Sequence, residues 1–329
     1  MKNFMNQVDS VLEESLDGFA AAHSDIVVLG EDYEFVRRKE IKQGKVALIS
    51  GGGAGHEPLH AGFVGYGMLD AACPGQIFTS PTPNQMMNAA NAVDGGAGVL
   101  FIVKNYAGDM MNFQMAAEIL DQENATVIVN DDVAVENSTH TTGRRGVAGT
   151  LIVERILGAA AERGDSLLEL KKLGDAVNKA TASMAVALSS CTVPAAGKPT
   201  FQISSTDMEI GVGIHGEPGR RRVPLASADE IALELTKAVL DDLALKPGQE
   251  VILLVNGFGG TPLLELYLMV NAAHKVLAGA GVSVARHLTG SYVTSLEMAG
   301  CSITVCVADS EMLALWDAPV HTAALRWGM

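Results

Sequence analysis

Short apolar runs alternate along this chain with longer segments that have helical periodicity. Each run gives way within a few residues to Gly, Asn or Asp, and runs that are apolar throughout are typical of strands covered on both faces. The runs are Lys45–Ser50, Gly98–Tyr106, Thr126–Asn130 and Val251–Asn256. The helical segments between them are Asn84–Ala92, Met110–Leu120 and Thr150–Arg163. This order predicts an α/β fold, with two α/β domains whose mostly parallel or mixed sheets are flanked by helices.

The sequence becomes richer in proline and poorer in helical periodicity near residue 190. The 329 residues are enough for about two domains. Residues 190–224 have few helical stretches and contain Pro194, Pro199, Pro218 and Pro224. A further helix is predicted over Ser227–Leu243, where a second α/β unit begins. We therefore predict an N-terminal domain over residues 1–185 and a C-terminal domain over residues 186–329.

Charge and composition exclude several classes of protein. The net charge is 23 − 38 = −15, which argues against a nucleic-acid surface built from clustered Lys and Arg. The longest apolar runs are far shorter than the ~20 residues that span a bilayer, and the acidic Met1–Leu16 segment predicts an amphipathic helix instead of a signal peptide. Four scattered cysteines favour a reducing compartment. We expect a cytoplasmic protein that binds neither membrane nor nucleic acid.

The first candidate site is the stretch Ser50–Pro58 (SGGGAGHEP), directly after a predicted strand. Four glycines in five positions let backbone N–H groups approach an oxygen-rich ligand. No Lys-Ser/Thr pair follows, so the stretch is not a P-loop, and His56 stands where the dinucleotide-binding spacing needs glycine. A tight turn with a histidine near a helix start is the simpler alternative.

Two other segments place titratable groups beside glycine. Asp109 follows the 98–106 run, where it is either an N-cap or a base for a substrate hydroxyl. Lys104 precedes it as a salt-bridge partner or a phosphate contact. His215 lies in Gly211–Gly219 (GVGIHGEPG), flanked by glycines that leave its imidazole accessible. A neutral imidazole can act as ligand, base or nucleophile, although a turn histidine is the plainer alternative.

Several weaker candidates are expected to be structural. Asp131 and Asp132 could hold a cation or act as an acid/base pair, but a solvated loop at the strand end is the preferred interpretation. Solvated faces or subunit contacts are expected for the basic runs Arg144–Arg145 and Arg220–Arg222. Buried thiols are expected at Cys301 and Cys306, and the loop Asn256–Pro262 either borders a ligand or turns the chain into a helix over Leu263–Leu277. C-x-x-C does not occur, and the stretch 56–60 (HEPLH) matches H-E-x-x-H but is not in a predicted helix, where that motif binds zinc, so no metal site is predicted.

Taken together, long segments resemble the K subunit family of dihydroxyacetone (glycerone) kinases. They occur in order over essentially the whole chain: SGGGAGHEP (50–58), ACPGQIFTSPTPNQ (72–85), VKNYAGDMMNF (103–113), TVPAAGKP (192–199), GVGIHGEPG (211–219) and ALWDAPVHT (314–322). This resemblance is far more specific than any single glycine loop.

The resemblance implies roles for the candidate residues. His215 would attack the ketone of dihydroxyacetone through Nε2 and form a covalent hemiaminal. Asp109 would accept the proton of the hydroxyl that is phosphorylated, and His56 would hydrogen-bond the substrate and assist catalysis. The implied substrate pocket also includes Gly53, Ala54, Gly55 and Lys104. Glycerol has no carbonyl and could not be anchored in this way.

The resemblance also implies partners. The chain resembles the bacterial type, in which a separate L subunit holds Mg²⁺ and ADP or ATP, and a phosphotransferase-system protein recharges that nucleotide. No cofactor is therefore expected on this chain, which would be catalytically incomplete alone and would serve glycerol metabolism. The family forms homodimers. Residues 221–247 are predicted to run from a helix directly into the next strand, at a place where some relatives have extra strands at the dimer interface.

Two alternative functions remain open at this point. Some members of the family act as coactivators of a transcription regulator and keep the ligand pocket. A hemiaminal histidine serves such a sensor as well as it serves a kinase. A kinase subunit for another short ketose, such as erythrulose, is also compatible with covalent anchoring.

Overall fold

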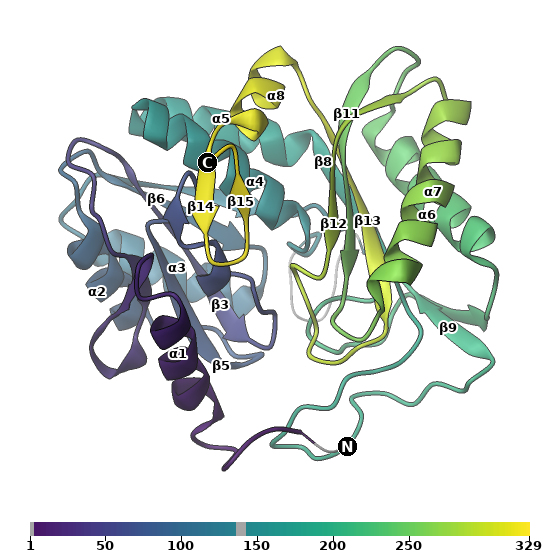
Figure 1. Cartoon of the computed structure of the whole chain (residues 1–329), viewed down its shortest axis with the longest axis horizontal. Helices are drawn as coiled ribbons and strands as arrows, with labels where there is room; N and C mark the ends of the chain where they lie inside the picture. The colour runs from purple at the N-terminus through teal and green to yellow at the C-terminus, as the bar shows by residue number, and fades with distance from the viewer. Residues whose placement is uncertain (1–2, 136–142) are drawn as a thin grey trace. The chain divides into compact units, whose positions relative to one another are not determined.

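The computed structural model describes residues 3–135 and 143–329 (Figure 1). The chain divides into two compact units, the first comprising residues 1–128, 153–176 and 314–329, and the second residues 129–152 and 177–313. The predicted single boundary between residues 185 and 186 differs from this division because the chain passes between the units more than once. The helices that carry it across are α4 (Gly149–Arg163), α5 (Leu167–Lys179) and α8 (Ser310–Asp317).

Unit 1 is built on a six-stranded sheet with the order β1-β2-β5-β3-β6-β7. Its central strand β3 pairs in parallel with β5 and β6, whereas β1 and β2 extend the sheet in antiparallel fashion. The strands are β1 (Val27–Leu29), β2 (Val36–Arg38), β3 (Ala47–Ala54), β5 (Ala71–Ile77), β6 (Val99–Lys104) and β7 (Asn124–Val129). A smaller antiparallel sheet joins β4 (Gly65–Tyr66), β14 (Val320–Thr322) and β15 (Arg326–Trp327).

Three further helices belong to unit 1: α1 (Val11–Ala22), α2 (Pro83–Val93) and α3 (Ala107–Ile119). α2 begins with a capping box between Thr82 and Gln85. Its buried face packs with that of α3 against the sheet, around Phe101 and Phe113. α1 starts at Val11 and not at the predicted residue 1, and the described residues before it are exposed up to Asp9. A helix there would have no apolar surface to pack against.

Unit 2 contains a mixed six-stranded sheet with the order β10-β9-β8-β13-β11-β12. β11 pairs in parallel with β12 and in antiparallel fashion with β13. The strands are β8 (Thr181–Ala187), β9 (Asp207–Ile210), β10 (Arg221–Pro224), β11 (Glu250–Gly257), β12 (Ser283–Gly290) and β13 (Gly300–Val307). Helices α6 (Ala228–Leu243) and α7 (Leu263–Gly279) supply the apolar side chains that complete its core. The predicted α/β class, with mixed sheets flanked by helices, is confirmed.

The helix predicted over Ser227–Leu243 agrees closely with α6. Ser227 is its N-cap and accepts a hydrogen bond from the backbone N–H of Glu230, whose side chain accepts one in return from the Ser227 backbone. Such a capping box is visible in sequence because both partners lie within one turn. Local signals of this kind make a helix start predictable.

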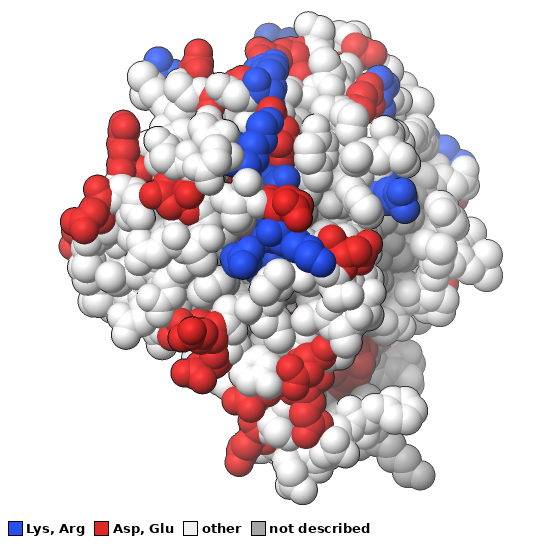
Figure 2. All heavy atoms as spheres, turned by 60° about the vertical axis from the view of Figure 1, so that its left-hand side comes forward, with Lys and Arg blue, Asp and Glu red and all other residues white. Residues whose placement is uncertain are grey.

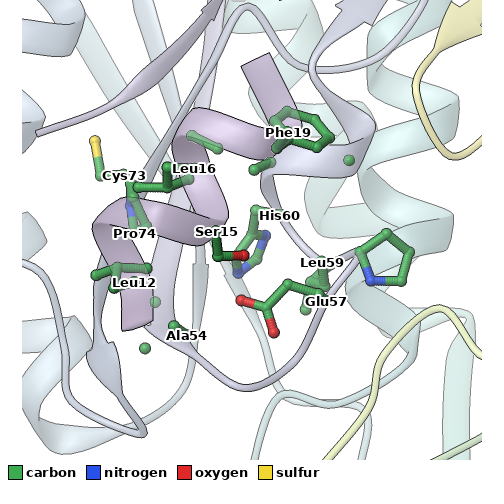
Figure 3. A pocket seen from close by; sticks show the side chains of 16 residues that line it. Leu12, Ser15, Leu16, Phe19, Ala54, Glu57, Leu59, His60, Cys73 and Pro74 are labelled. Atoms are coloured by element: carbon green, nitrogen blue, oxygen red, sulfur yellow. The ribbon is translucent and has the colours of Figure 1, made fainter. Parts of the chain in front are cut away.

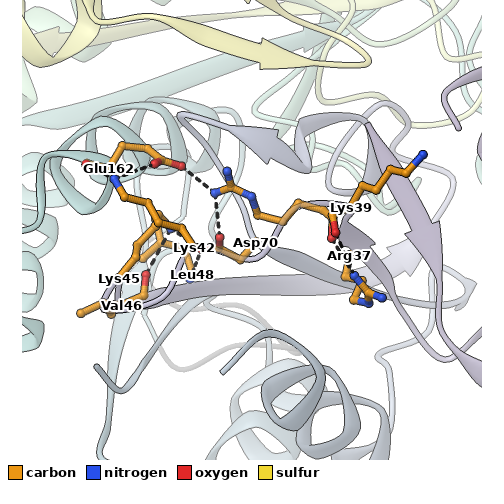
Figure 4. A network of polar contacts seen from close by, with 9 residues as sticks. Arg37, Lys39, Lys42, Lys45, Val46, Leu48, Asp70 and Glu162 are labelled. Atoms are coloured by element: carbon orange, nitrogen blue, oxygen red, sulfur yellow. Dashed lines mark hydrogen bonds and ion pairs between the residues drawn. The ribbon is translucent and has the colours of Figure 1, made fainter. Parts of the chain in front are cut away.

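A buried ionic network joins the sheet of unit 1 to α4 (Figure 4). Arg38 Nη1 lies 3.0 Å from Asp70 Oδ1 and 2.6 Å from Glu162 Oε1. Lys42 contacts Glu162, and Lys45 contacts Asp70. Asp70 also accepts a hydrogen bond from the backbone N–H of Leu48, so its charge is balanced by cations and an amide.

Acidic side chains are distributed in several groups over the face of the molecule in Figure 2. Lys and Arg gather there in a narrower band, with acidic side chains among them. Of the described residues drawn on this face, none forms the broad cationic area that binds a phosphate backbone. Among the described helices, none is both long and apolar enough to cross a membrane.

Candidate active site

The first part of the glycine-rich stretch, up to Ala54, belongs to the strand itself, and residues 55–58 form a turn after it. β3 continues to Ala54, four residues beyond its predicted end. A Cβ on Gly51 would lie 2.6 Å from the carbonyl oxygen of Cys73, and one on Gly53 would lie 2.5 Å from the backbone nitrogen of Thr79. The glycines therefore permit close packing against β5 and the segment after it. The predicted strand end at Ser50 was wrong because this need for glycine arises from a neighbour that is distant in sequence.

This packing predicts a stability difference between two glycine substitutions. Gly53→Ala places a methyl group against backbone that cannot yield, so we expect a loss of about 1–3 kcal/mol in the free energy of unfolding. Gly18→Ala is the matched control, because Gly18 lies within α1 and a Cβ there meets nothing within 4 Å. It should gain about 0.5–1 kcal/mol. Urea unfolding of both variants measures the difference, and equal stabilities would contradict the packing argument.

The end of β3 opens onto a cavity with a volume of about 400 Å³ (Figure 3). Gly52, Gly53 and Ala54 form one wall, and side chains of α1, such as Leu16 and Phe19, form another. The rest of the lining is Leu12, Ser15, residues 57–62 and residues 72–74. The cavity lies within unit 1 and has a mostly apolar lining with a few polar groups, as small-molecule sites commonly do.

His56 follows this strand and is fully buried. Its ring stacks on Phe78, with ring centroids 5.1 Å apart and planes at 26°. Gly55 turns the chain between β3 and His56 with a φ of +99°, and its N–H donates to Glu57 Oε2 at 2.9 Å. The stacking fixes the imidazole plane, which a histidine needs in order to present a ring nitrogen in a set direction.

Lys104 and Asp109 lie on either side of the turn from β6 into α3. Lys104 is the last residue of β6 and is completely buried, and Asp109 is 2% exposed. Tyr106 is the N-cap of α3, so Asp109 belongs to the first turn and its N-cap alternative was wrong. Lys104 Nζ lies 3.8 Å from Asp109 Oδ2. This ion pair agrees with the salt-bridge alternative predicted for Lys104. Burial raises the pKa of Asp109 and lowers that of Lys104, while each charge opposes the shift of the other.

Two buried residues that the sequence analysis did not single out extend this pair. His60 Nε2 lies 2.7 Å from Lys104 Nζ, and His60 Nδ1 lies 2.7 Å from Glu154 Oε1 on α4. Glu154 is fully buried, and this burial raises its pKa to about 8. Burial also lowers the pKa of His60 well below its ordinary value, and the positive charge of Lys104 lowers it further. The sequence held weak signals for both: His60 is the second histidine of the HEPLH stretch, and Glu154 and its neighbour Arg155 are charged residues in the otherwise apolar stretch 151–161.

His215 belongs to unit 2, in the segment between β9 and β10. Its ring is partly buried, with Nδ1 inaccessible to solvent. Gly211 and Gly216 have φ values of +77° and +72°, which glycine adopts readily. The backbone N–H of His215 donates to Glu217 Oε2 at 2.9 Å. The glycines therefore bend the segment tightly around the histidine.

The buried Arg145 anchors this segment through hydrogen bonds. Its Nη1 donates to Glu217 Oε1 at 2.9 Å, its Nη2 to the carbonyl of Gly211 at 2.9 Å, and its Nε to Asp132 Oδ2 at 2.7 Å. Arg145 and Asp132 are 4% and 1% exposed. The solvated face predicted for Arg145 and the solvated loop predicted for Asp132 were therefore wrong. A planar guanidinium can satisfy three acceptors at once, so it organises a buried turn well.

Asp131 is also buried, contrary to the same loop prediction. It accepts hydrogen bonds from the backbone N–H groups of Val147 and Gly149, at 2.8 and 2.7 Å, and a third from the hydroxyl of Ser183. Because Gly149 begins α4, the carboxylate satisfies N–H groups that a helix start leaves without partners. Asp131 is thus a structural link between β8 and α4.

The remaining candidates have structural surroundings. Asn256 accepts hydrogen bonds from the backbone N–H groups of Tyr292 and Val293, and the loop after it leads into α7 at Leu263. The buried thiols predicted at Cys301 and Cys306 are confirmed, and burial raises their pKa values to about 12 and about 11. Partners of the second basic run include Glu234 for Arg221 and Glu209 for Arg222. Among the described residues no group of three or more His, Cys, Asp or Glu side chains could hold a metal ion.

Unit 1 therefore contains Gly53, Ala54, Gly55, His56, Lys104 and Asp109, and unit 2 contains His215. The first six cluster around the ends of two adjacent parallel strands, β3 and β6, where α/β folds commonly bind ligands. Their roles in binding a substrate, and that of His215, stay predictions.

Comparison with known proteins defines the family. Residues 17–324 match the model of the Dak1 domain, so the chain belongs to the Dak1 domain family. The resemblance inferred from the motifs, to a family of kinase subunits, is confirmed.

Its curated relatives include two bacterial subunits of similar length. The chain is 48% identical, over 100% of both chains, to the PEP-dependent dihydroxyacetone kinase, dihydroxyacetone-binding subunit DhaK, of Escherichia coli (strain K12). It is also 48% identical to the dihydroxyacetone-binding subunit of PTS-dependent dihydroxyacetone kinase 1 of Listeria innocua, over 98% of this chain and 100% of that one.

Two solved structures share the fold. The dihydroxyacetone kinase from C. freundii, solved with AMP-PNP and Mg²⁺, has a TM-score of 0.90 and 32% identity, over 99% of this chain and 61% of that one. The dihydroxyacetone kinase operon co-activator Dha-DhaQ has a TM-score of 0.91 and 32% identity, over 96% and 98% of the two chains.

Proposed function

We propose that this chain is the dihydroxyacetone-binding subunit of a dihydroxyacetone kinase. The observation that carries the proposal is the 48% identity, over the whole of both chains, with a bacterial subunit of that name. The buried Asp109 beside Lys104, next to the glycine-lined end of β3, supports it chemically. Such a site offers a carboxylate for a hydroxyl proton and a cation for developing negative charge.

In the proposed mechanism, Nε2 of His215 attacks the carbonyl carbon of dihydroxyacetone. A carbon–nitrogen bond forms while the C=O π electrons move to the oxygen. The oxygen takes up a proton and the imidazole loses its Nδ1 proton, so the product is a neutral hemiaminal. The inaccessible Nδ1 supports this choice of nitrogen. Selection of a ketose over glycerol then follows from covalent chemistry, because glycerol has no carbonyl.

Asp109 then takes the proton of the terminal hydroxyl as that oxygen attacks the phosphoryl group. Its position in the first turn of α3 stabilises the carboxylate through the helix dipole, whereas burial raises its pKa toward the range of an effective base. His56 hydrogen-bonds the substrate, and Gly53, Ala54, Gly55 and Lys104 line the same pocket. Fixed orientation of the hydroxyl converts a diffusive encounter into a positioned transfer.

The phosphoryl donor is proposed to lie on another chain. A separate L subunit would bind ADP or ATP with Mg²⁺, and a phosphotransferase-system protein would recharge that nucleotide. The names of the bacterial relatives, PEP-dependent and PTS-dependent dihydroxyacetone kinase subunits, support this arrangement. The human triokinase/FMN cyclase, 40% identical, matches this chain over only 58% of its own length and so has further sequence. A homodimer and a cytoplasmic location complete the proposal.

Reconstitution tests the proposed function directly. The purified chain, the L subunit, Mg²⁺ and a recharging phosphoryl source are expected to convert dihydroxyacetone into dihydroxyacetone phosphate, and to leave glycerol unchanged. Omission of either subunit should abolish the product. Erythrulose in the same assay tests the alternative of another short ketose. Binding of dihydroxyacetone without any phosphorylated product would reject the kinase proposal.

A ligand-sensing co-activator is the second candidate function. It is favoured by one observation, the TM-score of 0.91 with the operon co-activator Dha-DhaQ. The identity with that protein is 32%, against 48% with the kinase subunit of Escherichia coli, which places the kinase proposal first. A sensor would bind the ketose through His215 but give no product in the reconstituted system.

A further inference from the structure

Four titratable side chains form a continuous buried row in unit 1. Asp109 Oδ2 lies 3.8 Å from Lys104 Nζ, which lies 2.7 Å from His60 Nε2. His60 Nδ1 lies 2.7 Å from Glu154 Oε1. None of the four residues is more than 5% exposed. The proposed mechanism uses Asp109 and Lys104 and gives no task to the other two.

We propose that His60 and Glu154 are positioning residues, which hold the amine of Lys104 toward Asp109 and exchange a proton with it. The proposal rests on the proposed function, in which Asp109 accepts the hydroxyl proton. Its geometric basis is that both ring nitrogens of His60 are engaged at 2.7 Å, one by an amine and the other by a carboxylate.

The two short contacts restrict where protons can lie. A neutral imidazole has one N–H, so it donates in one contact and accepts in the other. In the first arrangement the Lys104 ammonium donates to His60 Nε2, and Nδ1–H donates to the Glu154 carboxylate. Moving one proton along each bond leaves a neutral amine, an Nε2–H imidazole and a protonated Glu154. Both arrangements hold the same number of protons.

The surroundings keep the two proton arrangements close in free energy, because opposing effects act on them. Burial disfavours charge on Lys104, His60 and Glu154, so it favours the second arrangement. A negative charge on Asp109 favours the ammonium of the first. The other polar or titratable groups that face the row are His56 beside His60, Ser50 beside Glu154, Ser80 beside Asp109, and the carbonyl of Gly51, 3.2 Å from Lys104 Nζ.

The exchange gives the transferred proton a destination. After Asp109 has taken the hydroxyl proton, a neutral Lys104 amine can accept that proton and restore the carboxylate. An O–H bond of Asp109 breaks, and an N–H bond of Lys104 forms. The proton that Lys104 had earlier passed through His60 rests on Glu154, so no further donor or acceptor is needed.

Glu154→Gln tests the proposal without catalysis. The glutamine oxygen can still accept from His60 Nδ1–H, but the amide can neither hold a proton nor carry a negative charge. Lys104 then loses an anion that favours its ammonium, and Asp109 loses part of the cation that favours its carboxylate. We expect the titration midpoint of Asp109, followed by carbon NMR of its carboxyl group in the isolated chain, to rise by about one pH unit.

Glu162→Gln is the matched control, because Glu162 is also a buried carboxylate of α4 but pairs with Arg38 and Lys42 (Figure 4). It should lower the free energy of unfolding and leave the Asp109 midpoint unchanged. Equal midpoints in wild type and Glu154→Gln would overturn the proposal. Because no substrate or L subunit is present, this result does not depend on whether the chain proves to be a kinase.

A measurement on the unsubstituted chain applies even where Glu154→Gln does not fold. Nitrogen NMR of the His60 ring is expected to show one N–H and one bare nitrogen from about pH 5 to about pH 8, because the row keeps the imidazole neutral. A His60 that becomes imidazolium with a midpoint near ~6.5, like a free histidine, would overturn the proposal.

Discussion

Replacement of His215 with alanine is expected to abolish the retention of dihydroxyacetone by the purified chain during gel filtration. The proposed hemiaminal needs a nitrogen nucleophile, and without it only a few hydrogen bonds would hold a three-carbon ligand, which is too little for a slow dissociation. The segment itself should persist in the variant, because the contact from residue 215 to Glu217 comes from the backbone N–H. Carbon NMR with dihydroxyacetone labelled at the carbonyl adds a direct readout, the appearance of an sp³ carbon signal in the wild-type chain alone.

His287→Ala is the control for this prediction. His287 belongs to the same unit, on β12, where its ring stacks on that of His274 with centroids 4.7 Å apart. Its removal should leave both the retained ketose and the sp³ signal unchanged. Undiminished retention in His215→Ala would remove the covalent role of that histidine and with it the proposed basis of ketose selectivity.

Asp109→Asn is expected to keep the adduct and to lose about 10²–10⁴-fold in kcat, the usual contribution of a positioned general base. The amide has the shape of the carboxyl group but cannot take the hydroxyl proton. Adduct formation at His215 does not use this side chain in the proposed mechanism, so retention and turnover should separate. The reconstituted assay measures turnover, and gel filtration measures retention. Rates near those of the wild type would assign the base to another residue.

Glu118→Gln serves as the control, since Glu118 lies on the same helix α3 and its exposed side chain contacts Gln114. Its turnover should be unaffected. The pH dependence carries a second test. Because burial raises the pKa of Asp109, the acid limb of kcat/KM should lie above the ordinary value for Asp, which is ~3.9. Activity should fall as the pH decreases through this raised pKa and Asp109 becomes protonated.

The sequence identified groups whose signals are local. The α6 start at Ser227 and Glu230, the strand–turn–helix around Lys104 and Asp109, and the glycines around His215 each depend on residues within a few positions of one another. Patterns of this length follow from backbone preference and helix capping, which neighbouring residues decide. The family motifs belong to the same category because they are contiguous.

The errors have a common physical origin. Arg145 and Asp132 look like surface charges in sequence, yet they are buried because each offers the other a partner, 13 residues apart. The strand end at Ala54 was missed because the strand's glycines pack closely against the backbone of β5 and of residues 78–79, which are distant in sequence. Charge alone predicts exposure, but a charged side chain with satisfied hydrogen bonds can be buried.

Sequence alone determined the α/β class, the family and the chemical types of the candidate groups, because composition, periodicity and contiguous motifs carry that information. Only the tertiary structure placed His60, 44 residues from Lys104 and 94 from Glu154, between an amine and a carboxylate. Which charges face one another, and how far burial shifts their protons, depends on pairs of side chains that the fold brings together and that no local pattern encodes.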